Sequence, residues 1–496
     1  MTAPRPGRSS LRGGLAAFAL AGTLADPGAA GRLRVGILTD PLSLDPHQAT
    51  DVVSVAIVAN VCETLVRFDS IHPAPTLATS WATLDGRSWT LTLRQGVRFH
   101  DGQPFDADAV VANLERLRQV RSFPGRAERV GPHVVAIHLE RPNAALLATL
   151  SQPFYALQSP SSLGSERPVG TGPFRLAVSR PGSYELVANP DYWGGAPRLA
   201  QVSLRRLPSQ QALVSALLAG EIDIAPSVAQ EQVARLHQST EINLESQTGF
   251  NIAFLSLNNE RAPFSDRRVR QAVARAIDRD ALVTRILGGH GMPARNPIPP
   301  SLFGYGASTK ELILDRPAVR RLLAEAGWPS GFDATLLAVD SPRPYLPAPL
   351  RLAAQLKDDL AQVGIRVTIQ QVPSWAEYVE RGNRGRFDMM LHGWQADTGD
   401  PNDFLSALVA SEAIGTTNRS RYRSPEMDNL LKRGRMGTDV EERLAAYREA
   451  QELFQRDMPW VPLYHVAVFT ASRRPVRGLS LGLTGVIRFD KVWKAE

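Results

Sequence analysis

The stretch ATSWATLDGRSWTLTLRQGVRFHDGQPFDADAVVANLERL, residues 78–117, carries the pattern that decides the fold. In its middle, the segment WTLTLR alternates apolar and polar side chains, which predicts a strand with one buried face. Gly96 marks a turn into a second short strand. Pro104 and Asp106 then predict the start of a helix whose apolar face includes Val110. This strand–turn–strand–helix unit contains no catalytic pattern.

Composition restricts the classes of protein that the chain can belong to. A chain of 496 residues is too long for one core and indicates two or three domains. The formal net charge is +7 and the pI is about 9.7. Basic and acidic residues are interspersed along the chain, so we expect no nucleic-acid partner.

The first thirty residues have the pattern of a secretory signal peptide. An arginine-rich start precedes the apolar run Leu15–Leu24, which is too short to span a bilayer, and small residues end at Ala30. Removing residues 1–30 takes away three Arg and one Asp, so the mature charge is +7 − 3 + 1 = +5. The single cysteine, Cys62, allows no internal disulfide and lies too far from the signal to carry a lipid. We therefore expect a free periplasmic protein, cleaved near Ala30, that is not a lipoprotein and is a monomer.

Strand and helix patterns alternate along the rest of the chain, which predicts an α/β fold. Ser265 is a candidate N-cap, and Thr438 with Glu441 forms a candidate capping box for a helix that ends near Asp457. The remaining predicted elements are helices over 52–65, 210–218 and 350–363, and strands over 134–139, 250–257 and 365–370.

Short motifs within and around the first stretch carry a resemblance to a known family. They are Ser80-Trp81, Asp85-Gly86, Phe99-His100-Asp101-Gly102 and Pro104-Phe105. Their spacing resembles that of the extracellular solute-binding proteins of ABC importers, family 5, which includes dipeptide-, oligopeptide- and nickel-binding members. The resemblance implies a periplasmic binding protein of type II, in which a hinge joins two α/β lobes and an extra domain is inserted.

The resemblance also implies a division of the chain and a partner. Lobe I is expected to be discontinuous, over 31–65, 171–255 and 466–496. The inserted domain is expected over 66–170 and lobe II over 256–465. The partner is an ABC permease in the inner membrane, and no cofactor is implied.

One acidic residue matches the family position that binds a peptide's amino terminus. The segment LHGWQADTGDPNDFL contains Trp394-x-x-Asp397 followed by Gly-Asp-Pro. Burying the ammonium group of a peptide needs an ionised carboxylate with good geometry, which favours Asp397 for this role. The alternative is that Asp397 is a loop residue that bonds its own backbone.

The segment that begins at Arg343 resembles the part of dipeptide-binding members that holds the peptide carboxylate. A guanidinium can bind a carboxylate through two hydrogen bonds. Tyr345 is expected to form a wall of the same pocket. The alternative, that Arg343 is a surface residue in a proline-rich loop, stays open.

Three other residues are candidates for contact with the ligand. Trp394 and Trp375 offer large flat surfaces that tolerate varied side chains, although core packing accounts equally well for Trp375. Thr50 falls where family members line the cleft from lobe I. Some oligopeptide binders have a carboxylate at this position, so the Thr weakens any assignment to long peptides.

Two alternative functions remain. The same scaffold could hold a metal chelate such as nickel, haem, glutathione, an opine or a sugar, and His392 is the residue that favours a chelate. The spacing of Asp397, Asp400 and Asp403 is not that of a calcium loop, so no metal site is expected, and Asp400 is predicted to cap a helix.

The other alternative is a secreted serine hydrolase. Residues 478–482 match G-x-S-x-G around Ser480, but a strand-like segment follows where a hydrolase needs a helix. The leading prediction is therefore a receptor, not an enzyme, that captures short, dipeptide-like solutes between two lobes.

Overall fold

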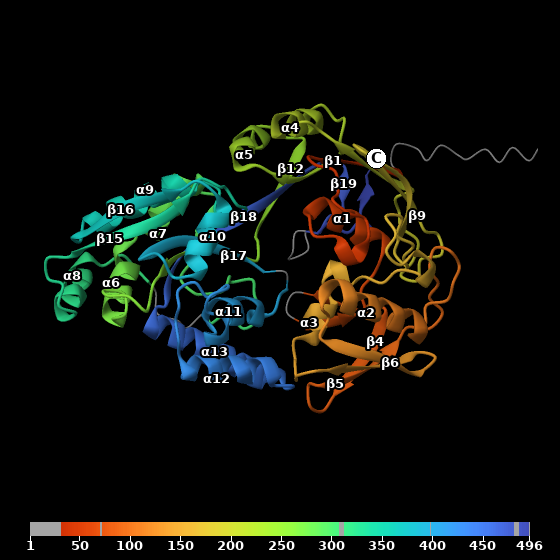
Figure 1. The fold of residues 1–496 in the computed structure, drawn as a ribbon. Helices are drawn as coiled ribbons and strands as arrows, with labels where there is room; N and C mark the ends of the chain where they lie inside the picture. The colour runs from red at the N-terminus through yellow and green to blue at the C-terminus, as the bar shows by residue number, and fades with distance from the viewer. Residues whose placement is uncertain (1–30, 70–71, 307–311, 397, 481–485, 496) are drawn as a thin grey trace, which may run out of the picture.

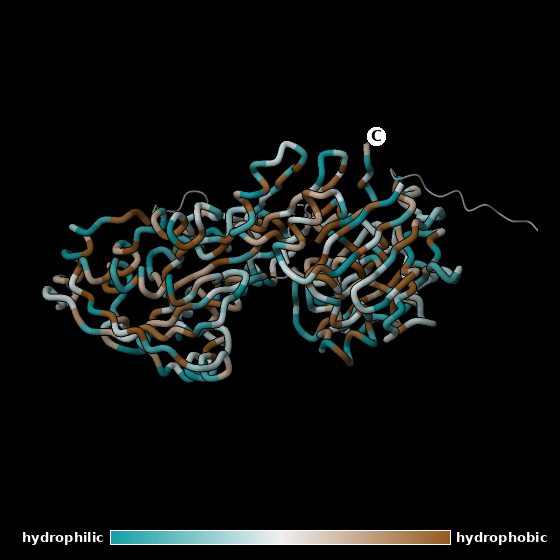
Figure 2. The backbone as a smooth tube through the Cα atoms, turned by 90° about the horizontal axis from the view of Figure 1, so that it is seen from above, coloured by the Kyte–Doolittle hydropathy of each residue, from teal (hydrophilic) through white to brown (hydrophobic). Residues whose placement is uncertain are grey.

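The computed structural model describes residues 31–69, 72–306, 312–396, 398–480 and 486–495. Its helices and strands form two bodies of α/β structure that lie side by side and are joined by strands at one end (Figure 1). Seen from above, the two bodies are separate masses connected over a short central stretch (Figure 2). The two-lobed α/β arrangement confirms the predicted fold class.

One mixed sheet continues from one body into the other. Its strand order is β16-β15-β17-β13-β18-β11-β1-β10-β9-β8, and β12 and β14 also pair with β18. These strands are β1 (Arg32–Ile37), β8 (Phe174–Arg180), β9 (Ser183–Ala188), β10 (Gln201–Arg206), β11 (Ile224–Val228), β12 (Ile242–Thr248), β13 (Asn251–Leu257), β14 (Gly291–Pro293), β15 (Phe332–Val339), β16 (Ile365–Val372), β17 (Met389–Gln395) and β18 (Trp460–Arg473).

Lobe I contains β1, β8 to β12 and the second half of β18. In β1 the apolar residues Leu33, Val35 and Ile37 are buried, as expected for a strand covered by helices. This strand runs parallel to both β10 and β11. The helices of lobe I are α1 (Val52–Val61), α4 (Gln210–Leu218) and α5 (Gln230–His237), and the short strands β19 (Val476–Arg477) and β20 (Trp493–Lys494) pair near the C-terminus.

The segment that opened the sequence analysis lies in a second, smaller sheet with the order β4-β5-β7-β6. In β5, Trp89, Leu91 and Leu93 are buried while the residues between them are exposed, which confirms the predicted alternation. Asp106 caps α2 by accepting a hydrogen bond from the backbone N–H of Ala109. The elements here are β2 (Val66–Asp69), β3 (His72–Pro75), β4 (Ala78–Thr83), β5 (Ser88–Leu93), α2 (Ala107–Arg121), β6 (Gly125–Gly131), β7 (Val134–Leu139) and α3 (Leu146–Leu150).

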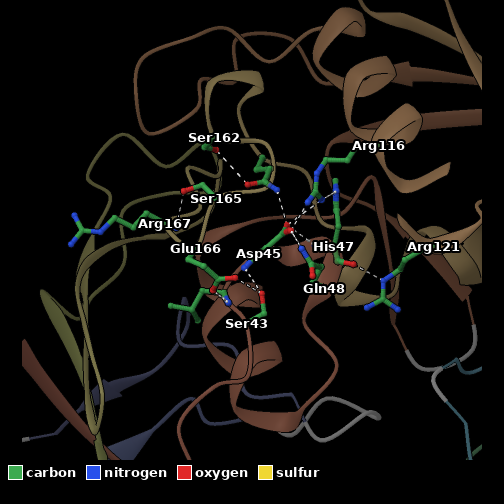
Figure 3. A network of polar contacts seen from close by, with 12 residues as sticks. Ser43, Asp45, His47, Gln48, Arg116, Arg121, Ser162, Ser165, Glu166 and Arg167 are labelled. Carbon is green, nitrogen blue, oxygen red and sulfur yellow. Dashed lines mark hydrogen bonds and ion pairs between the residues drawn. The ribbon is translucent and has the colours of Figure 1, made fainter. Parts of the chain in front are cut away.

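A network of polar contacts holds this smaller sheet and its helix against lobe I (Figure 3). Asp45, which is fully buried, accepts from Nη2 of Arg116 on α2 at 2.5 Å and from Nε2 of Gln158 at 3.1 Å. Arg116 also donates to Nδ1 of His47 at 2.8 Å. Because a buried ion pair is costly to break, this network ties α2 to the segment before α1.

Lobe II contains β13 to β17 and the first half of β18. In α6 the side chains of Val269, Ala272, Val273 and Ala276 are buried at helical spacing, which gives the helix one apolar face. The helices of lobe II are α6 (Arg267–Ala276), α7 (Arg279–Leu287), α8 (Arg316–Glu325), α9 (Pro349–Ala361), α10 (Trp375–Asn383), α11 (Pro401–Val409), α12 (Pro425–Met436) and α13 (Val440–Asp457).

The chain passes between the lobes in two places that lie next to each other. One is the Gly249–Phe250 link between β12, which pairs with the second half of β18, and β13, which pairs with the first half. The other is β18 itself, near Val466. The side chain of Asn251 joins them: Nδ2 donates to the Val466 carbonyl at 2.9 Å, and Oδ1 accepts from the Val466 N–H at 2.8 Å. We call this region the crossing.

Several element ends differ from the sequence expectation. The helix predicted to run to residue 65 ends at Val61, because the Val61 carbonyl accepts from the N–H of Gly172. The N-cap of α6 is Asp266 instead of Ser265, and that of α13 is Asp439 instead of Thr438. In both cases a carboxylate one residue further along caps the helix: Asp266 accepts from the N–H of Arg268, and Asp439 from the N–H of Glu442.

Candidate ligand-binding site

A cavity of about 330 Å³ lies where the two lobes meet. Parts of the chain far apart in sequence line it: the end of α1, residues 151–153, the crossing, the segment after β17 and the C-terminal segment. The main lining residues are Ala59, Cys62, Arg67, Gln152, Phe250, Thr398, Gly399, Ser480, Arg488, Asp490 and Lys491. A solute held in this cavity would contact both lobes at once.

The lobe I wall of the cavity is supported by a buried carboxylate. Glu63 is 1% exposed and accepts hydrogen bonds from Oγ1 of Thr171 at 2.9 Å, the Tyr192 hydroxyl at 2.7 Å and Nε1 of Trp193 at 2.7 Å. Nη2 of Arg488 lies 3.9 Å from the same carboxylate. Since the protein itself engages both oxygens, Glu63 holds the wall in place and is not available to a solute.

Cys62, beside Glu63, lines the cavity as a small buried side chain. Burial raises the pKa of its thiol far above the usual range, so the thiol stays protonated at neutral pH. Cys62 therefore packs as a small buried side chain and is not a reactive thiol.

The lobe II wall is formed at one edge of its sheet. Strands β16 and β17 both run parallel to β15, so the loops that follow all three strands leave the sheet at the same edge. Arg343 and Tyr345 follow β15, Trp375 follows β16, and Trp394 lies at the end of β17. Thr398 and Gly399, which line the cavity, follow β17 at the same edge, whereas Arg343, Tyr345, Trp375 and Trp394 are not among the residues that line it.

Arg343 and Trp375 lie against each other. The guanidinium carbon of Arg343 is 4.0 Å from the centroid of the Trp375 ring. Trp375 also packs on Tyr378, with ring centroids 5.5 Å apart. Nε of Arg343 is buried and has no hydrogen-bond partner among the described residues.

Tyr345 lies over the backbone of Gly393, where a Cβ atom would overlap the tyrosine ring and come within 2.7 Å of the Ile252 carbonyl oxygen. Glycine at this position therefore lets the ring approach strand β17. Trp394 is partly buried, and its Nε1 donates to Oδ1 of Asp403 at 3.4 Å.

His392 does not lie in an open cleft. It is 4% exposed, its ring centroid is 5.2 Å from that of Phe254, and it contacts Nη1 of Arg419 through Nε2. Burial, with Arg419 as a second cause, holds the pKa of His392 well below its usual range, so the ring is neutral. No group of three or more potential metal ligands occurs among the described residues.

The remaining candidates are separate from this cluster. Thr50 is exposed on the loop before α1, next to the helix cap Asp51. Asp397 lies outside the described residues. Asp400 caps α11 as predicted and forms a buried ion pair with Arg443 at 2.6 Å.

Ser480 lines the cavity. The short strand β19 ends at Arg477, residues 478–480 have no strand or helix, and residues 486–495, which are described, form no helix. The strand–Ser–helix geometry that activates a hydrolase serine requires a helix after the serine. The described part of this segment therefore gives no support to a serine hydrolase.

The sequence did not single out Arg488, Asp490, Phe250 or Arg419. The two C-terminal residues reach the cavity only because the chain returns to lobe I after β18. Arg419 reaches His392 from a loop 27 residues further along the chain. No local pattern marks residues that long-range packing brings together.

The described helices include none with both the length and the apolar character needed to cross a membrane.

Comparisons with known proteins agree with this architecture. The family model for bacterial extracellular solute-binding proteins, family 5, matches residues 72–416. Di/tripeptide-binding protein 2 of Pseudomonas aeruginosa is 31% identical, over 98% of this chain and 99% of that protein. Heme-binding protein A of Haemophilus influenzae is 32% identical, over 82% of this chain and 81% of that protein.

A solved structure gives the same result for the fold. The periplasmic binding protein DppA of Helicobacter pylori, in complex with the peptide STSA, matches with a TM-score of 0.72 and 30% identity, over 94% of this chain and 98% of that one. The match of the family model to most of the chain, together with a full-length relative, decides the assignment. The chain belongs to family 5 of the bacterial extracellular solute-binding proteins.

Proposed function

We propose that this protein captures short peptides in the cavity between its lobes and delivers them to the permease of an ABC importer. The observation that carries the proposal is a cavity lined by both lobes in a chain whose full-length relative binds di- and tripeptides. The site is that of a receptor, and ATP would be hydrolysed by other subunits of the importer. The location would be the periplasm, with residues 1–30 as the signal peptide.

The mechanism is closure of the lobes about the crossing. Lobe I, with residues 31–65, 171–255 and 466–496, would move with the inserted domain over 66–170, and lobe II, over 256–465, would move against them. A peptide that contacts both walls binds the closed arrangement better than the open one, and so shifts the population toward it. The permease would recognise the closed form.

The two ends of the peptide would be bound by opposite charges. Asp397 would bind the ammonium group and Arg343 the terminal carboxylate, whereas Tyr345, Trp394 and Trp375 would contact the side chains. Arg343 supports this role because it follows β15 at the sheet edge from which the cavity residues Thr398 and Gly399 also come, and because its buried Nε has no partner among the described residues. Thr50 would contribute from lobe I.

Titration of the tryptophan fluorescence tests the proposal. Ala-Ala is expected to bind and to be recovered intact, whereas N-acetyl-Ala-Ala, which lacks the ammonium group, is expected to bind more weakly by about 2–5 kcal/mol. Asp397→Asn should weaken Ala-Ala by a similar amount and leave the acetylated peptide unchanged. If acetylation leaves the affinity of the natural protein unchanged, the assignment of an ammonium site is wrong.

A second candidate function is haem binding, favoured by the similarity to heme-binding protein A. Added haemin distinguishes the two functions, because the absorption spectrum of haem shifts when haem binds to a protein. A saturable shift that Ala-Ala does not reverse would favour haem, and no shift would favour the peptide.

A further inference from the structure

A second cavity lies between the smaller sheet and lobe II, and we call it the side chamber. Its volume is about 310 Å³, and it shares the wall residues Phe68 and Gly399 with the cavity between the lobes. We infer that the side chamber is a part of the solute site that takes up one aromatic side chain, so that the protein prefers peptides with such a side chain. The inference rests on the proposed function, because it names the class of peptide that the same site selects.

The two shared residues show that the side chamber adjoins the main cavity. Phe68, on β2, comes from the lobe I side, and Gly399, in the segment between β17 and α11, comes from lobe II. A solute in the main cavity, which measures about 330 Å³, therefore has only this border to pass before it reaches the side chamber. Each cavity alone is at the lower end of the range of about 300–1,000 Å³ that is typical of small-molecule sites, so a bulky solute needs both.

Aromatic rings form much of the wall of the side chamber. Phe68, Trp81 and Trp89 come from β2, β4 and β5, and Phe303 comes from lobe II. Nε1 of Trp89 donates to the Gly86 carbonyl at 3.1 Å, so the polar atom of this ring is already satisfied. Aromatic groups pack favourably against one another by faces and edges, and the apolar area that they remove from water adds to this attraction. An aromatic side chain in the side chamber would therefore contact rings from both lobes.

The charges in the side chamber compensate each other. Among the described residues that line it, only Asp400 and Arg443 are charged, and they form an ion pair at 2.6 Å. Oδ1 of Asp400 also accepts from the N–H of Asn402 at 3.0 Å, and Nε of Arg443 donates to the Gly434 carbonyl at 2.7 Å. A charged side chain of a solute would lose its water here without gaining a free partner, so the side chamber favours an apolar group over an ionised one.

A backbone contact between the lobes lies beside the side chamber. The N–H of Ala144, a residue of its wall, donates to the carbonyl of Arg435 at the end of α12, at 2.7 Å. Because both lobes supply walls, the side chamber is complete only when the lobes are as close together as they are here. A group that fills it binds this arrangement better than an open one, and so shifts the population toward closure.

The test measures the affinities of Ala-Ala, Phe-Ala, Ala-Phe, Glu-Ala and Ala-Glu by calorimetric titration. Because the side chamber adjoins the main cavity at one border, only one of the two positions in a dipeptide is expected to reach it. The tighter of Phe-Ala and Ala-Phe is expected to bind at least about tenfold more tightly than Ala-Ala, which corresponds to about 1.4 kcal/mol. The glutamate peptide with the same position is expected to bind no more tightly than Ala-Ala.

Two variants show whether the aromatic side chain enters the side chamber. Ala144→Phe fills the chamber with a ring of the protein, and Trp81→Ala removes a ring from its wall, so each is expected to bring the ratio of the phenylalanine peptide to Ala-Ala closer to one. Val130→Phe is the matched control, because it adds the same ring to a 61% exposed site on β6, at the opposite edge of the smaller sheet from β4. It is expected to keep the ratio of the natural protein. If Ala144→Phe does not fold, Trp81→Ala gives the answer.

Binding of both phenylalanine peptides no tighter than that of Ala-Ala would overturn the inference and leave the proposed function in place. A preference that survives in Ala144→Phe and in Trp81→Ala would also overturn it, because the ring would then be bound elsewhere. If none of the five peptides binds, the proposed function fails and this inference fails with it.

Discussion

Arg343 combines two features that a carboxylate-binding arginine needs. Its guanidinium lies on the face of Trp375, which fixes its plane, and its Nε is buried with no partner among the described residues. A ligand carboxylate that filled this position would gain a charge-assisted hydrogen bond in a partly dry environment.

Replacing this residue tests the proposed contact directly. Arg343→Gln is expected to weaken the binding of Ala-Ala by about 2–5 kcal/mol, because the ligand carboxylate would be left buried without a partner. Ala-Ala-amide, which has no carboxylate, should bind the variant and the natural protein equally. Arg351→Gln, an exposed arginine on the next helix, is the control. Equal losses for the acid and the amide would show that the variant disturbs packing and not a charge contact.

At the scale of single residues, the sequence predicts the role of a side chain when that role involves only its neighbours along the chain. Asp106 and Asp400 were identified as helix caps because a cap depends only on the next three residues. His392 could not be placed in the same way. Its burial depends on Phe254 and on Arg419, which are far from it in sequence, so no neighbouring residue indicates a closed environment.

At the scale of elements, periodicity was the most reliable signal. The strand over 134–139 and the helix over 210–218 have the bounds that the sequence predicts. The predicted end of α1 was wrong, because the N–H of Gly172, from a segment more than a hundred residues away, donates to the Val61 carbonyl. The predicted division into domains stays a prediction, although the strand pairing puts the passage between lobes at Gly249–Phe250, a few residues before the expected boundary at 255.

The crossing depends on one side chain that replaces backbone pairing. Asn251 is 4% exposed and satisfies both the N–H and the carbonyl of Val466, where β18 passes from one lobe to the other. Asn251→Ala would leave both backbone groups buried without a partner. We expect the free energy of unfolding to fall by about 1–3 kcal/mol, measured by urea denaturation.

The control for this variant is Asn243→Ala, on the exposed side of the adjoining strand β12, which is expected to change stability by less than about 0.5 kcal/mol. Similar losses in the two variants would mean that the Asn251 side chain has no special part in joining the strands.

For the whole molecule, His47, His100 and His465 link stability to pH, and the buried His392, whose pKa is also held below its usual range, acts in the same direction. Burial is the main cause that lowers the pKa values of His47, His100 and His465, each to about 4. Between pH 6.5 and about 4 the unfolded chain binds protons at these sites and the folded protein does not. Their contribution to stability is therefore complete above pH 6.5 and is lost as the pH falls toward 4.

We expect the free energy of unfolding to decrease between pH 6.5 and 5 by up to about 1.4 kcal/mol per pH unit for each of the three histidines. Urea denaturation at a series of pH values measures this slope. His47→Gln should reduce the slope by the contribution of one histidine, up to about 1.4 kcal/mol per pH unit. A slope that is the same in the natural protein and in His47→Gln would contradict the assignment.

The 14-residue strand β18 has a consequence for how such proteins can be recombined. Its first half completes the sheet of one lobe and its second half completes the sheet of the other. Neither lobe can therefore be exchanged between relatives as an independent unit. A chimera that takes only residues 250–459 from a relative would pair β13 of one parent with β18 of the other along the whole length of their contact. Hybrids with altered solute preference should therefore take β12, β13 and β18 from a single parent, and vary only the loops at the sheet edges.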